Sequence, residues 1–372
     1  MNKIQSVESV TEGKTDVLVF KSKESKKGPG SKDKLPFYNP SMELNRDLSV
    51  LVCQRLINNS KKHVSILDGL AASGIRGIRF ANEVDGDFDV TINDWNPIAH
   101  NLINENIEKL KLKNVTALNC NLNALLFENK FDYIDIDPFG SPVYFIDSAM
   151  RSICNDGIIA CTATDTATLC GTYPKVCLRR YSAVPFHSIV MKEIGIRILL
   201  GFICREAGKY DRGIKPLISY STDHYFRVYI QVINGKSKAN DSMKNYSIVK
   251  SNELFTSKTK IAKIGPLWVG KLQNKKTVSE LRTILFEKQL NTKNDIWKLL
   301  DLLEEEADAP AFFFTTDSLS SMLKLPLPKI KDIFEKLRSK GYVVMRTHFS
   351  PTGFKTNAPL DKIKEVFKEH KT

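Results

Sequence analysis

The sequence predicts an α/β fold with a doubly wound parallel sheet, followed by a smaller C-terminal α+β domain. Three observations predict it. Short apolar runs alternate with helical patterns between residues 64 and 235. Asn96-Pro97 and Ser141-Pro142 read as helix starts, with a capping residue followed by proline in the first turn. With 372 residues and 42% hydrophobic content, the chain is also large enough for two domains.

The predicted elements of the first domain follow in order along the chain. Strands are expected near residues 64–70, 89–94, 115–120, 131–137 and 157–163. Helices are expected between them, near residues 75–84, 97–112, 123–128 and 142–154. A longer helical pattern then covers 187–206, and the alternating pattern of 216–233 predicts a terminal strand pair. Functional side chains should therefore gather between strand ends and helix starts, where such sheets bind ligands.

The second domain is predicted from the polar stretch at 234–263, which is rich in Lys, Ser and Asn and reads as a boundary or an inserted hairpin. We expect domains at residues 1–235 and 236–372. Helical patterns near 293–307, 315–323 and 327–340 precede a strand and a Pro-Gly turn. This order resembles a winged-helix arrangement, in which Arg346 and Lys355 would contact nucleic-acid phosphate; the alternative is that both are solvated surface charges.

Charge and cysteine content narrow the class of protein. The chain carries 55 Lys and Arg against 42 Asp and Glu, a net charge of +13, which favours nucleic acid as the partner over a small acidic metabolite. Seven cysteines without a C-x-x-C pair indicate reduced core thiols. The start of the chain lacks a signal peptide and the longest apolar stretch is short, so we expect a soluble, cytoplasmic protein. The basic segment at 21–27 is expected to be a mobile loop.

A small-residue loop after the first predicted strand indicates a ligand site. Residues 68–77 read Asp-Gly-Leu-Ala-Ala-Ser-Gly-Ile-Arg-Gly, and glycines there let the backbone approach a ligand. The loop has neither the Lys-Ser/Thr of a phosphate loop nor the G-x-G-x-x-G spacing, so a ligand without phosphates, such as S-adenosylmethionine, fits better. Asp94 ends the next strand about 25 residues after Asp68, where doubly wound folds place a ribose-binding carboxylate. Its alternative role is to cap the next helix.

The tetrad Asp137-Pro138-Phe139-Gly140 carries the most chemistry, because it ends the apolar run of residues 131–137. A carboxylate, a rigid proline and an aromatic ring at a strand end could hold a flat, amine-bearing ring while a methyl group arrives. This pattern favours an amino-methyltransferase. The tetrad alone is also compatible with an ordinary Asp-Pro turn.

Together these motifs resemble the tRNA guanine-26 N2-dimethyltransferases of archaeal type, over residues 10–360. The matching segments are Glu12-Gly13, Phe37-Tyr38-Asn39-Pro40, Met42, Asn45-Arg46-Asp47, residues 72–77, residues 135–140, Thr164-Asp165-Thr166, His224-Tyr225-Phe226-Arg227, Gly265-Pro266-Leu267-Trp268, Arg346-Thr347-His348-Phe349 and Lys355-Thr356. The resemblance implies a class I S-adenosylmethionine-dependent methyltransferase domain and a family-specific C-terminal domain that binds tRNA. The implied reaction places one or two methyl groups on the exocyclic N2 of guanosine 26.

The resemblance also implies roles for single residues. Arg46 and Arg76 would bind the methyl donor, Asp94 its ribose hydroxyls, and Asn121 with Leu122 would frame the adenine. Relatives often carry an acid where Asn121 stands, so donor affinity is the property that this departure would affect. Many members carry zinc-type cysteines ahead of the Gly-Pro-Leu-Trp run; none lies between residues 205 and 372, so we expect no metal.

The reaction itself explains the choice of Asp137 as the catalytic residue. The N2 of guanine is a poor nucleophile because its lone pair is delocalised into the ring. A carboxylate that accepts one N2–H localises the lone pair and can take the proton. The carbonyl of Pro138 could accept the second N–H, and Phe139 could stack on the base for about 1–3 kcal/mol. Asp135, two residues earlier, is a second candidate base, although a hydrogen-bonding role inside the sheet is favoured for it.

Two alternatives stay open. The chain could be an amino-methyltransferase for another guanine or adenine of RNA or DNA, or a catalytically inactive RNA-binding relative. The target base should leave its stack to reach the site. We expect a monomer.

Overall fold

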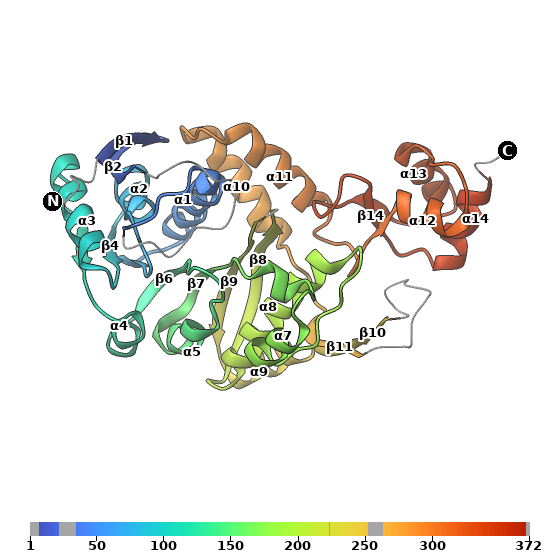
Figure 1. Cartoon of the computed structure of the whole chain (residues 1–372), viewed down its shortest axis with the longest axis horizontal. Coiled ribbons are helices and arrows are strands. Elements are labelled where there is room, and N and C mark those ends of the chain that lie inside the picture. The colour runs from blue at the N-terminus through green and yellow to red at the C-terminus, as the bar shows by residue number, and fades with distance from the viewer. Residues whose placement is uncertain (1–6, 22–34, 223, 252–262, 370–372) are drawn as a thin grey trace, which may run out of the picture.

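The computed structural model describes residues 7–21, 35–222, 224–251 and 263–369. Its centre is a seven-stranded mixed sheet with the order β5-β4-β3-β6-β7-β9-β8 (Figure 1). Five strands are parallel: β3 (Val64–Asp68), β4 (Phe88–Asn93), β5 (Val115–Leu118), β6 (Phe131–Ile136) and β7 (Ile153–Ala163). The strand order reverses between β3 and β6, so the switch point lies there.

The terminal strand pair closes the sheet as predicted. Strand β9 (Phe226–Asn234) runs antiparallel to β7, and β8 (Arg212–Ser221) runs antiparallel to β9. Because β9 begins where β7 ends, with Phe226 opposite Ala163, the start of β9 reaches the edge at which the parallel strands end. The segment before β9 therefore lies beside the strand-end loops.

Helices cover both faces of the sheet and form two hydrophobic cores. On one face pack α4 (Leu122–Glu128), α5 (Val143–Ser152) and α8 (Met191–Gly208). On the other pack α1 (Glu43–Asn58), α2 (Ile75–Glu83), α3 (Pro97–Leu110), α10 (Lys275–Glu287) and α11 (Lys293–Glu305). Strand β6 is buried along its whole length, as a central strand covered on both faces must be.

Local signals explain where several helices start. Asn96 caps α3, since its side chain accepts the Ile98 N–H and Pro97 takes the first turn, as predicted. Ser141 does not cap α5, contrary to the prediction. Pro142 occupies the N-cap position, and the Ser141 hydroxyl is 2.9 Å from the Tyr181 hydroxyl, which draws it away from the helix.

Several elements were not predicted. The hairpin of β1 (Val7–Glu12) and β2 (Thr15–Phe20), the 3-10 turn Pro40–Met42 and helix α1 precede the sheet. Two short helices, α6 (Thr166–Leu169) and α7 (Pro174–Tyr181), lie between β7 and α8. The predicted basic loop falls largely outside the described residues.

The segment after β9 packs on the sheet domain. It holds α9 (Lys236–Met243) and the antiparallel pair β10 (Tyr246–Lys250) and β11 (Lys263–Trp268). Leu267 and Trp268 belong to the core beneath α8, and residues of α10 and α11 belong to the core on the opposite face. A separate hydrophobic core begins only at Phe314 and extends to Phe367. The boundary near residue 235 stays a prediction, but this packing favours a later one.

The C-terminal unit combines a small sheet with three helices. Strands β12 (Phe314–Thr315), β14 (Gly353–Thr356) and β13 (Val344–Arg346) pair antiparallel in that order. Helices α12 (Thr316–Leu323), α13 (Ile330–Ser339) and α14 (Leu360–Glu369) complete it (Figure 1). The helix predictions for this region are confirmed, while its likeness to a winged helix stays a prediction. No helix in the described ranges combines the length and apolar character of a membrane span.

Candidate active site

The Asp-Pro-Phe-Gly tetrad forms a turn directly after β6, at the carboxyl edge of the parallel strands. Gly140 has a φ of +88° and donates its N–H to the Thr164 hydroxyl at 2.6 Å. Thr164, which follows β7, donates its own N–H back to the Gly140 carbonyl at 2.9 Å. Glycine suits this position because the backbone is left-handed there. The turn is therefore anchored to the end of the neighbouring strand.

Asp137 belongs to a group of charges that we call the strand-end cluster: Asp68, Arg76, Asp135, Asp137 and Arg227. Arg76 from α2 donates to Asp137 through Nη2, and its Nη1 donates to Asn45 Oδ1 and Ser49 Oγ, both at 2.7 Å. Its Nε lies 3.5 Å from Asp135 Oδ1. Asp137 is the solvent-accessible member of the cluster, with 19% of its side chain exposed.

Asp135 is fully buried and paired with Arg227 of β9. Arg227 donates to its two oxygens at 3.0 and 2.5 Å, and the Tyr133 hydroxyl donates at 3.0 Å. Burial alone would raise the pKa of Asp135, but Arg227 and Arg76 outweigh it and hold the pKa below its ordinary value. This geometry supports the favoured hydrogen-bonding role for Asp135 and argues against its use as a base.

Asp68 carries the opposite shift. Burial at the end of β3 raises its pKa to about 7, although Arg76 nearby opposes the change. Its Oδ2 accepts the Gly77 N–H at 2.9 Å and so ties the strand to the start of α2. The cluster thus holds three carboxylates and two arginines, and Asp68 is the carboxylate that most readily keeps a proton.

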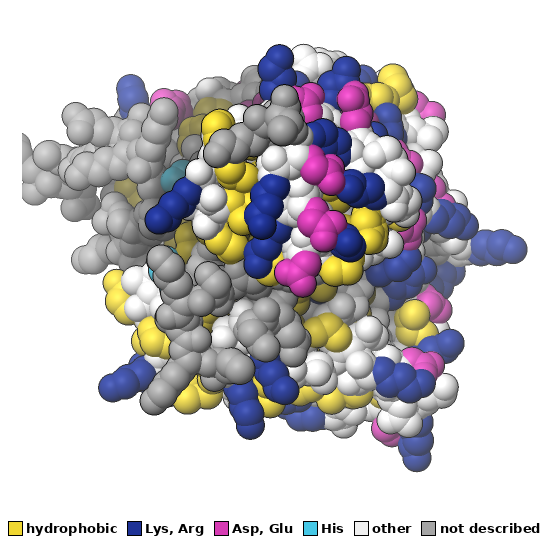
Figure 2. Space-filling model, turned by 90° about the vertical axis from the view of Figure 1, so that its right-hand side faces the viewer, with side chains coloured by type: hydrophobic (Ala, Val, Ile, Leu, Met, Phe, Trp, Pro, Cys, Tyr) yellow, Lys and Arg dark blue, Asp and Glu magenta, His cyan; other side chains and the backbone are white. Residues whose placement is uncertain are grey.

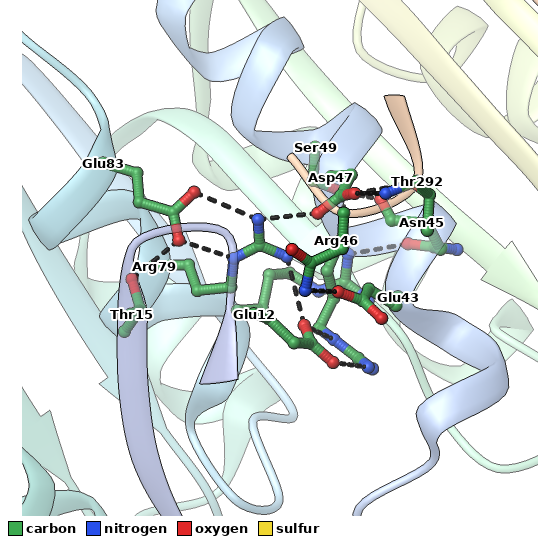
Figure 3. A network of polar contacts seen from close by, with 12 residues as sticks. Glu12, Thr15, Glu43, Asn45, Arg46, Asp47, Ser49, Arg79, Glu83 and Thr292 are labelled. Carbon is green, nitrogen blue, oxygen red and sulfur yellow. Dashed lines mark hydrogen bonds and ion pairs between the residues drawn. The ribbon is translucent and has the colours of Figure 1, made fainter. Parts of the chain in front are cut away.

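A second group of charges joins the N-terminal hairpin to α1 and α2; we call Glu12, Arg46, Asp47, Arg79 and Glu83 the hairpin network (Figure 3). Arg79 lies at its centre. It donates to Glu83 at 2.8 and 3.0 Å and to Glu12 at 3.1 Å, and its Nη2 lies 2.6 Å from Asp47. Arg79 and Asp47 have no exposed side-chain surface, so the network is an interior structure.

The two arginines predicted to bind the methyl donor are engaged to different extents. Arg46 binds Glu12 through Nε, at 2.7 Å, and through Nη2, which also donates to the Asn39 carbonyl. Its Nη1 has no hydrogen-bond partner among the described residues. Arg76 engages Asp135 and Asp137 of the strand-end cluster through Nε and Nη2, and its Nη1 donates to two neutral oxygens of α1. Arg46 is therefore the better candidate for a donor carboxylate, and Arg76 the residue that orients Asp137.

Asp94 does not cap the helix that follows it. Its two carboxylate oxygens accept the N–H groups of Ala72, at 2.7 Å, and Asn96, at 2.8 Å. Asp94 thereby fastens the small-residue loop to the end of β4. Each oxygen keeps a further lone pair for a hydroxyl donor, so a ribose role stays open.

Asn121 and Leu122 mark the start of α4. The Asn121 amide oxygen accepts the N–H groups of Asn123 and Ala124, so it acts as the helix cap in this structure. Leu122 is buried beside Gly69, where an added Cβ would lie 2.9 Å from the leucine side chain. Leu122 therefore requires a glycine in the loop. The adenine role of both residues remains a prediction.

Aromatic surface lies next to Asp137. Phe139 is 48% exposed, and its ring centroid lies 6.0 Å from that of Phe37 in a tilted arrangement. A pocket of about 200 Å³ opens at the same sheet edge, between Asn39 and Met42 on one side and His224 and Tyr225 on the other. These segments carry family motifs, but the sequence alone does not predict their place at the site.

The structure argues against Lys355 as a phosphate contact. Lys355 is buried, and its ammonium group lies 2.8 Å from Glu193 of α8. The ion pair joins the C-terminal unit to the sheet domain across 162 positions of sequence. Arg346 is partly exposed and donates to the Pro351 carbonyl at 2.8 Å. Its contact with nucleic acid stays a prediction.

The neighbouring His348 also joins the two parts of the chain. It pairs with Glu306 after α11 and accepts the Ser221 N–H at the end of β8, at 3.3 Å. Burial opposes ionisation of Glu306, but His348 outweighs it and lowers the pKa of that carboxyl to about 2.

In the described ranges no group of three or more His, Cys, Asp or Glu side chains could hold a metal ion. All seven cysteines are free, and five are buried.

Comparison with known proteins gives consistent matches over nearly the whole chain. The model of the family described as N2,N2-dimethylguanosine tRNA methyltransferase matches residues 13–368. A tRNA (guanine(26)-N(2))-dimethyltransferase of Pyrococcus furiosus is 40% identical and covers 97% of this chain and 98% of its own length. The enzyme of the same name from Methanobrevibacter smithii is 39% identical, covering 91% of this chain and 92% of its own.

A solved structure shares the fold. Trm1 from Pyrococcus horikoshii, in complex with S-adenosyl-L-methionine, superposes with a TM-score of 0.84 at 35% sequence identity. The match covers 96% of this chain and 99% of that protein.

Proposed function

The chain belongs to the N2,N2-dimethylguanosine tRNA methyltransferase family, and from that premise we propose that it methylates the exocyclic N2 of guanosine 26 in tRNA. The methyl donor is S-adenosylmethionine, which supplies the methyl group on a positively charged sulfur that needs no activation. The observation that carries the assignment of the site is Asp137: a partly exposed carboxylate at a strand end, held by an arginine, beside an exposed phenylalanine.

The sheet edge fits such a donor. Arg46 keeps the Nη1 side of its guanidinium for a carboxylate. Asp94 lies partly buried at the end of β4 with lone pairs available to ribose hydroxyls. The small-residue loop between β3 and α2 is fastened to Asp94 through the Ala72 N–H. Asn121 would contribute less than a carboxylate, since its amide oxygen already accepts two N–H groups.

Asp137 would perform the proton chemistry. Arg76 occupies its Oδ2, whereas Oδ1 has no hydrogen-bond donor among the described residues. This free oxygen could accept one N2–H of guanine, localise the nitrogen lone pair and take the proton as the N–C bond forms. The guanidinium of Arg76 fixes the orientation of the carboxylate. The Pro138 carbonyl could accept the second N–H.

Phe139 would hold the base. Its exposed ring lies beside Phe37, so a guanine that leaves its stack would find an aromatic surface next to Asp137. The C-terminal unit would contact the body of the tRNA, with Arg346 as a candidate phosphate ligand. We further expect the protein to act as a monomer in the cytoplasm and without a metal, as expectations that follow from the sequence.

The test is methyl transfer to an unmodified tRNA transcript and to the same transcript with adenosine in place of guanosine 26. We expect transfer of one or two methyl groups to the first transcript and none to the second. Equal transfer to both transcripts would overturn guanosine 26 as the target, and would favour an amino-methyltransferase that acts on another base. Binding of S-adenosylmethionine without transfer to either would indicate an inactive relative.

A further inference from the structure

The segment between Asp165 and Glu193 contains basic residues but no acidic ones. Residues 166–192 include Lys175, Arg179, Arg180 and Lys192 and no acidic residue. At the average of the chain, 42 acids in 372 residues, a segment of 27 residues would contain about three. The segment contains α6 and α7 and connects β7 with α8. A run of this kind on a protein surface attracts polyanions.

Helix α7 presents two of these cations on one exposed face. Lys175 and Arg179 lie four residues apart, so they project from the same side of the helix, and both are exposed. Neither forms an ion pair within the described part of the chain. Tyr173 and Leu178 flank them, with 56% and 52% of their surface exposed. The exposed surface of α7 therefore combines cations with large apolar side chains.

Folding alone does not account for this face. Like charges at positions i and i+4 of a helix destabilise it by a few tenths of a kcal/mol. The helix dipole favours Arg179 and Arg180, which lie in the last turn, but it disfavours Lys175, which lies in the first. Arg180 has a structural partner, Asp165, at 3.1 Å. Among the described residues, Lys175 and Arg179 have no such partner, so their charges are available to a ligand.

Helix α7 is connected to the candidate site. The Tyr181 hydroxyl at the end of α7 donates to Asp165 at 2.8 Å and lies 2.9 Å from the Ser141 hydroxyl. Ser141 follows the tetrad directly, and Asp165 follows Thr164, which holds Gly140. The last turn of α7 is thus fixed to both segments that position Phe139. The surface charge of the C-terminal unit differs from that of residues 166–192. The visible part of that end of the molecule shows Lys and Arg interspersed with Asp and Glu (Figure 2).

We propose that the exposed face of α7, formed by Tyr173, Lys175, Leu178 and Arg179, binds the sugar-phosphate backbone of tRNA beside the guanosine that enters the site. The inference rests on the proposed function. Lys175 and Arg179 neutralise phosphates, and Tyr173 and Leu178 contact sugars or an unstacked base. The face holds the nucleotides next to the target while the target base is outside its stack.

The test compares two double variants of the full chain, Lys175→Ala/Arg179→Ala and Lys61→Ala/Lys113→Ala. Lys61 and Lys113 are exposed and precede β3 and β5, at the opposite edge of the sheet. Both variants remove two positive charges, so the net charge of the protein changes equally. Binding of an unmodified tRNA transcript is measured by fluorescence anisotropy at several salt concentrations, and binding of S-adenosylmethionine by calorimetry.

We expect the α7 variant to bind tRNA about tenfold more weakly than the control variant. A plot of the logarithm of its binding constant against the logarithm of the salt concentration should also be less steep, with a slope smaller in magnitude by about two. Donor affinity should be unchanged, which shows that the site is folded. The exchange variant Lys175→Arg/Arg179→Lys should keep wild-type binding. Equal tRNA affinity of the α7 and control variants would overturn the inference.

The two proposals fail separately in this design. If the wild type binds tRNA through α7 but methylates no guanosine, the proposed function falls and the binding face stands. If the wild type methylates guanosine 26 and the α7 variant binds like the control, the binding face alone falls. Absence of tRNA binding by the wild type would overturn both.

Discussion

The hairpin network and the strand-end cluster each combine three carboxylates with two arginines, but they satisfy the excess negative charge differently. In the hairpin network, neutral donors complete the pairing: Thr15 donates to Glu83 and Thr292 to Asp47, both at 2.6 Å, and Tyr38 donates to Glu12 at 2.9 Å. In the strand-end cluster, Asp68 favours a proton and Asp137 reaches solvent.

This difference separates a structural set of charges from a reactive one. A buried ion pair contributes little net stability but is costly to break, so the hairpin network should affect folding. A carboxylate that keeps one free oxygen at the surface can meet a substrate, so the strand-end cluster should affect the rate. Three predicted effects test this division and a fourth tests the aromatic surface beside Asp137, from the largest expected effect to the smallest.

Asp137→Asn should abolish most of the chemistry and spare the fold. An amide cannot take the proton, so the single-turnover rate of methyl transfer should fall by about 10²–10⁴-fold. The free energy of unfolding should change by no more than about 1–2 kcal/mol, because the amide oxygen still accepts from Arg76. Rapid-quench assays and urea titration measure the two quantities.

Asp135→Asn is the matched control on the same strand. It leaves Arg227 buried without its full partner and should lower the free energy of unfolding by about 3–5 kcal/mol. The single-turnover rate should fall further in Asp137→Asn than in the folded fraction of Asp135→Asn. Equal losses would contradict the assignment of a catalytic role to Asp137 and a structural role to Asp135.

Arg79→Met should destabilise the protein strongly. It leaves three buried carboxylates of the hairpin network without their shared arginine, so the free energy of unfolding should fall by about 3–5 kcal/mol. Arg205→Met breaks a partly exposed pair with Glu206 and should cost at most about 1 kcal/mol. Urea unfolding at one pH measures both. Similar losses in the two variants would show that the network is not a structural core.

The pH dependence of stability should reveal the proton on Asp68. Burial raises its folded pKa to about 7, against about 3.9 in the unfolded chain. Between these two pH values the folded state binds more protons than the unfolded chain. The contribution of Asp68 to the free energy of unfolding should therefore fall by up to about 4 kcal/mol as the pH rises from 4 to 7. Above pH 7 this contribution should change no further. Asp68→Asn should lose this slope. Parallel stability curves for the wild type and the variant would contradict the prediction.

Phe139→Ala should weaken the hold on the base. Loss of one stacking surface costs about 1–3 kcal/mol, which lowers kcat/KM for tRNA by about 5–150-fold. The KM for the methyl donor should stay unchanged. Phe127 on α4 is also exposed, at 65%, and Phe127→Ala serves as the control without effect. If both variants lose activity equally, Phe139 does not contact the substrate.

Much of the fold follows from local patterns in the sequence. The strands were predicted because buried runs such as 131–137 are short, apolar and bounded by turn residues. Asp137 was found because a carboxylate and proline at a strand end stand out in such a run. Hairpin β1–β2 and helix α7 were missed, since their patterns are short and depend on packing against distant elements.

The parts of the site that could not be predicted depend on contacts between residues far apart in the sequence. Lys355 lies in a polar stretch and is expected at the surface. In the folded chain it is buried and forms an ion pair with Glu193, which lies 162 positions earlier. Arg227 and Asp135 pair across 92 positions, so neither residue alone indicates a buried ion pair. The donor role of Arg76 rests on a family motif, which names the residue and not its partners, and it stays a prediction. Such pairings become visible only when the chain is folded.

The central claim is that this sheet edge transfers methyl groups to the N2 of guanosine 26. Mass spectrometry of nucleosides from unmodified tRNA, treated with the wild-type protein and S-adenosylmethionine, tests it most directly. We predict N2-methylguanosine, N2,N2-dimethylguanosine or both, located at position 26. Methyl groups found only on adenosine, or on a ring nitrogen of guanosine, would contradict the account.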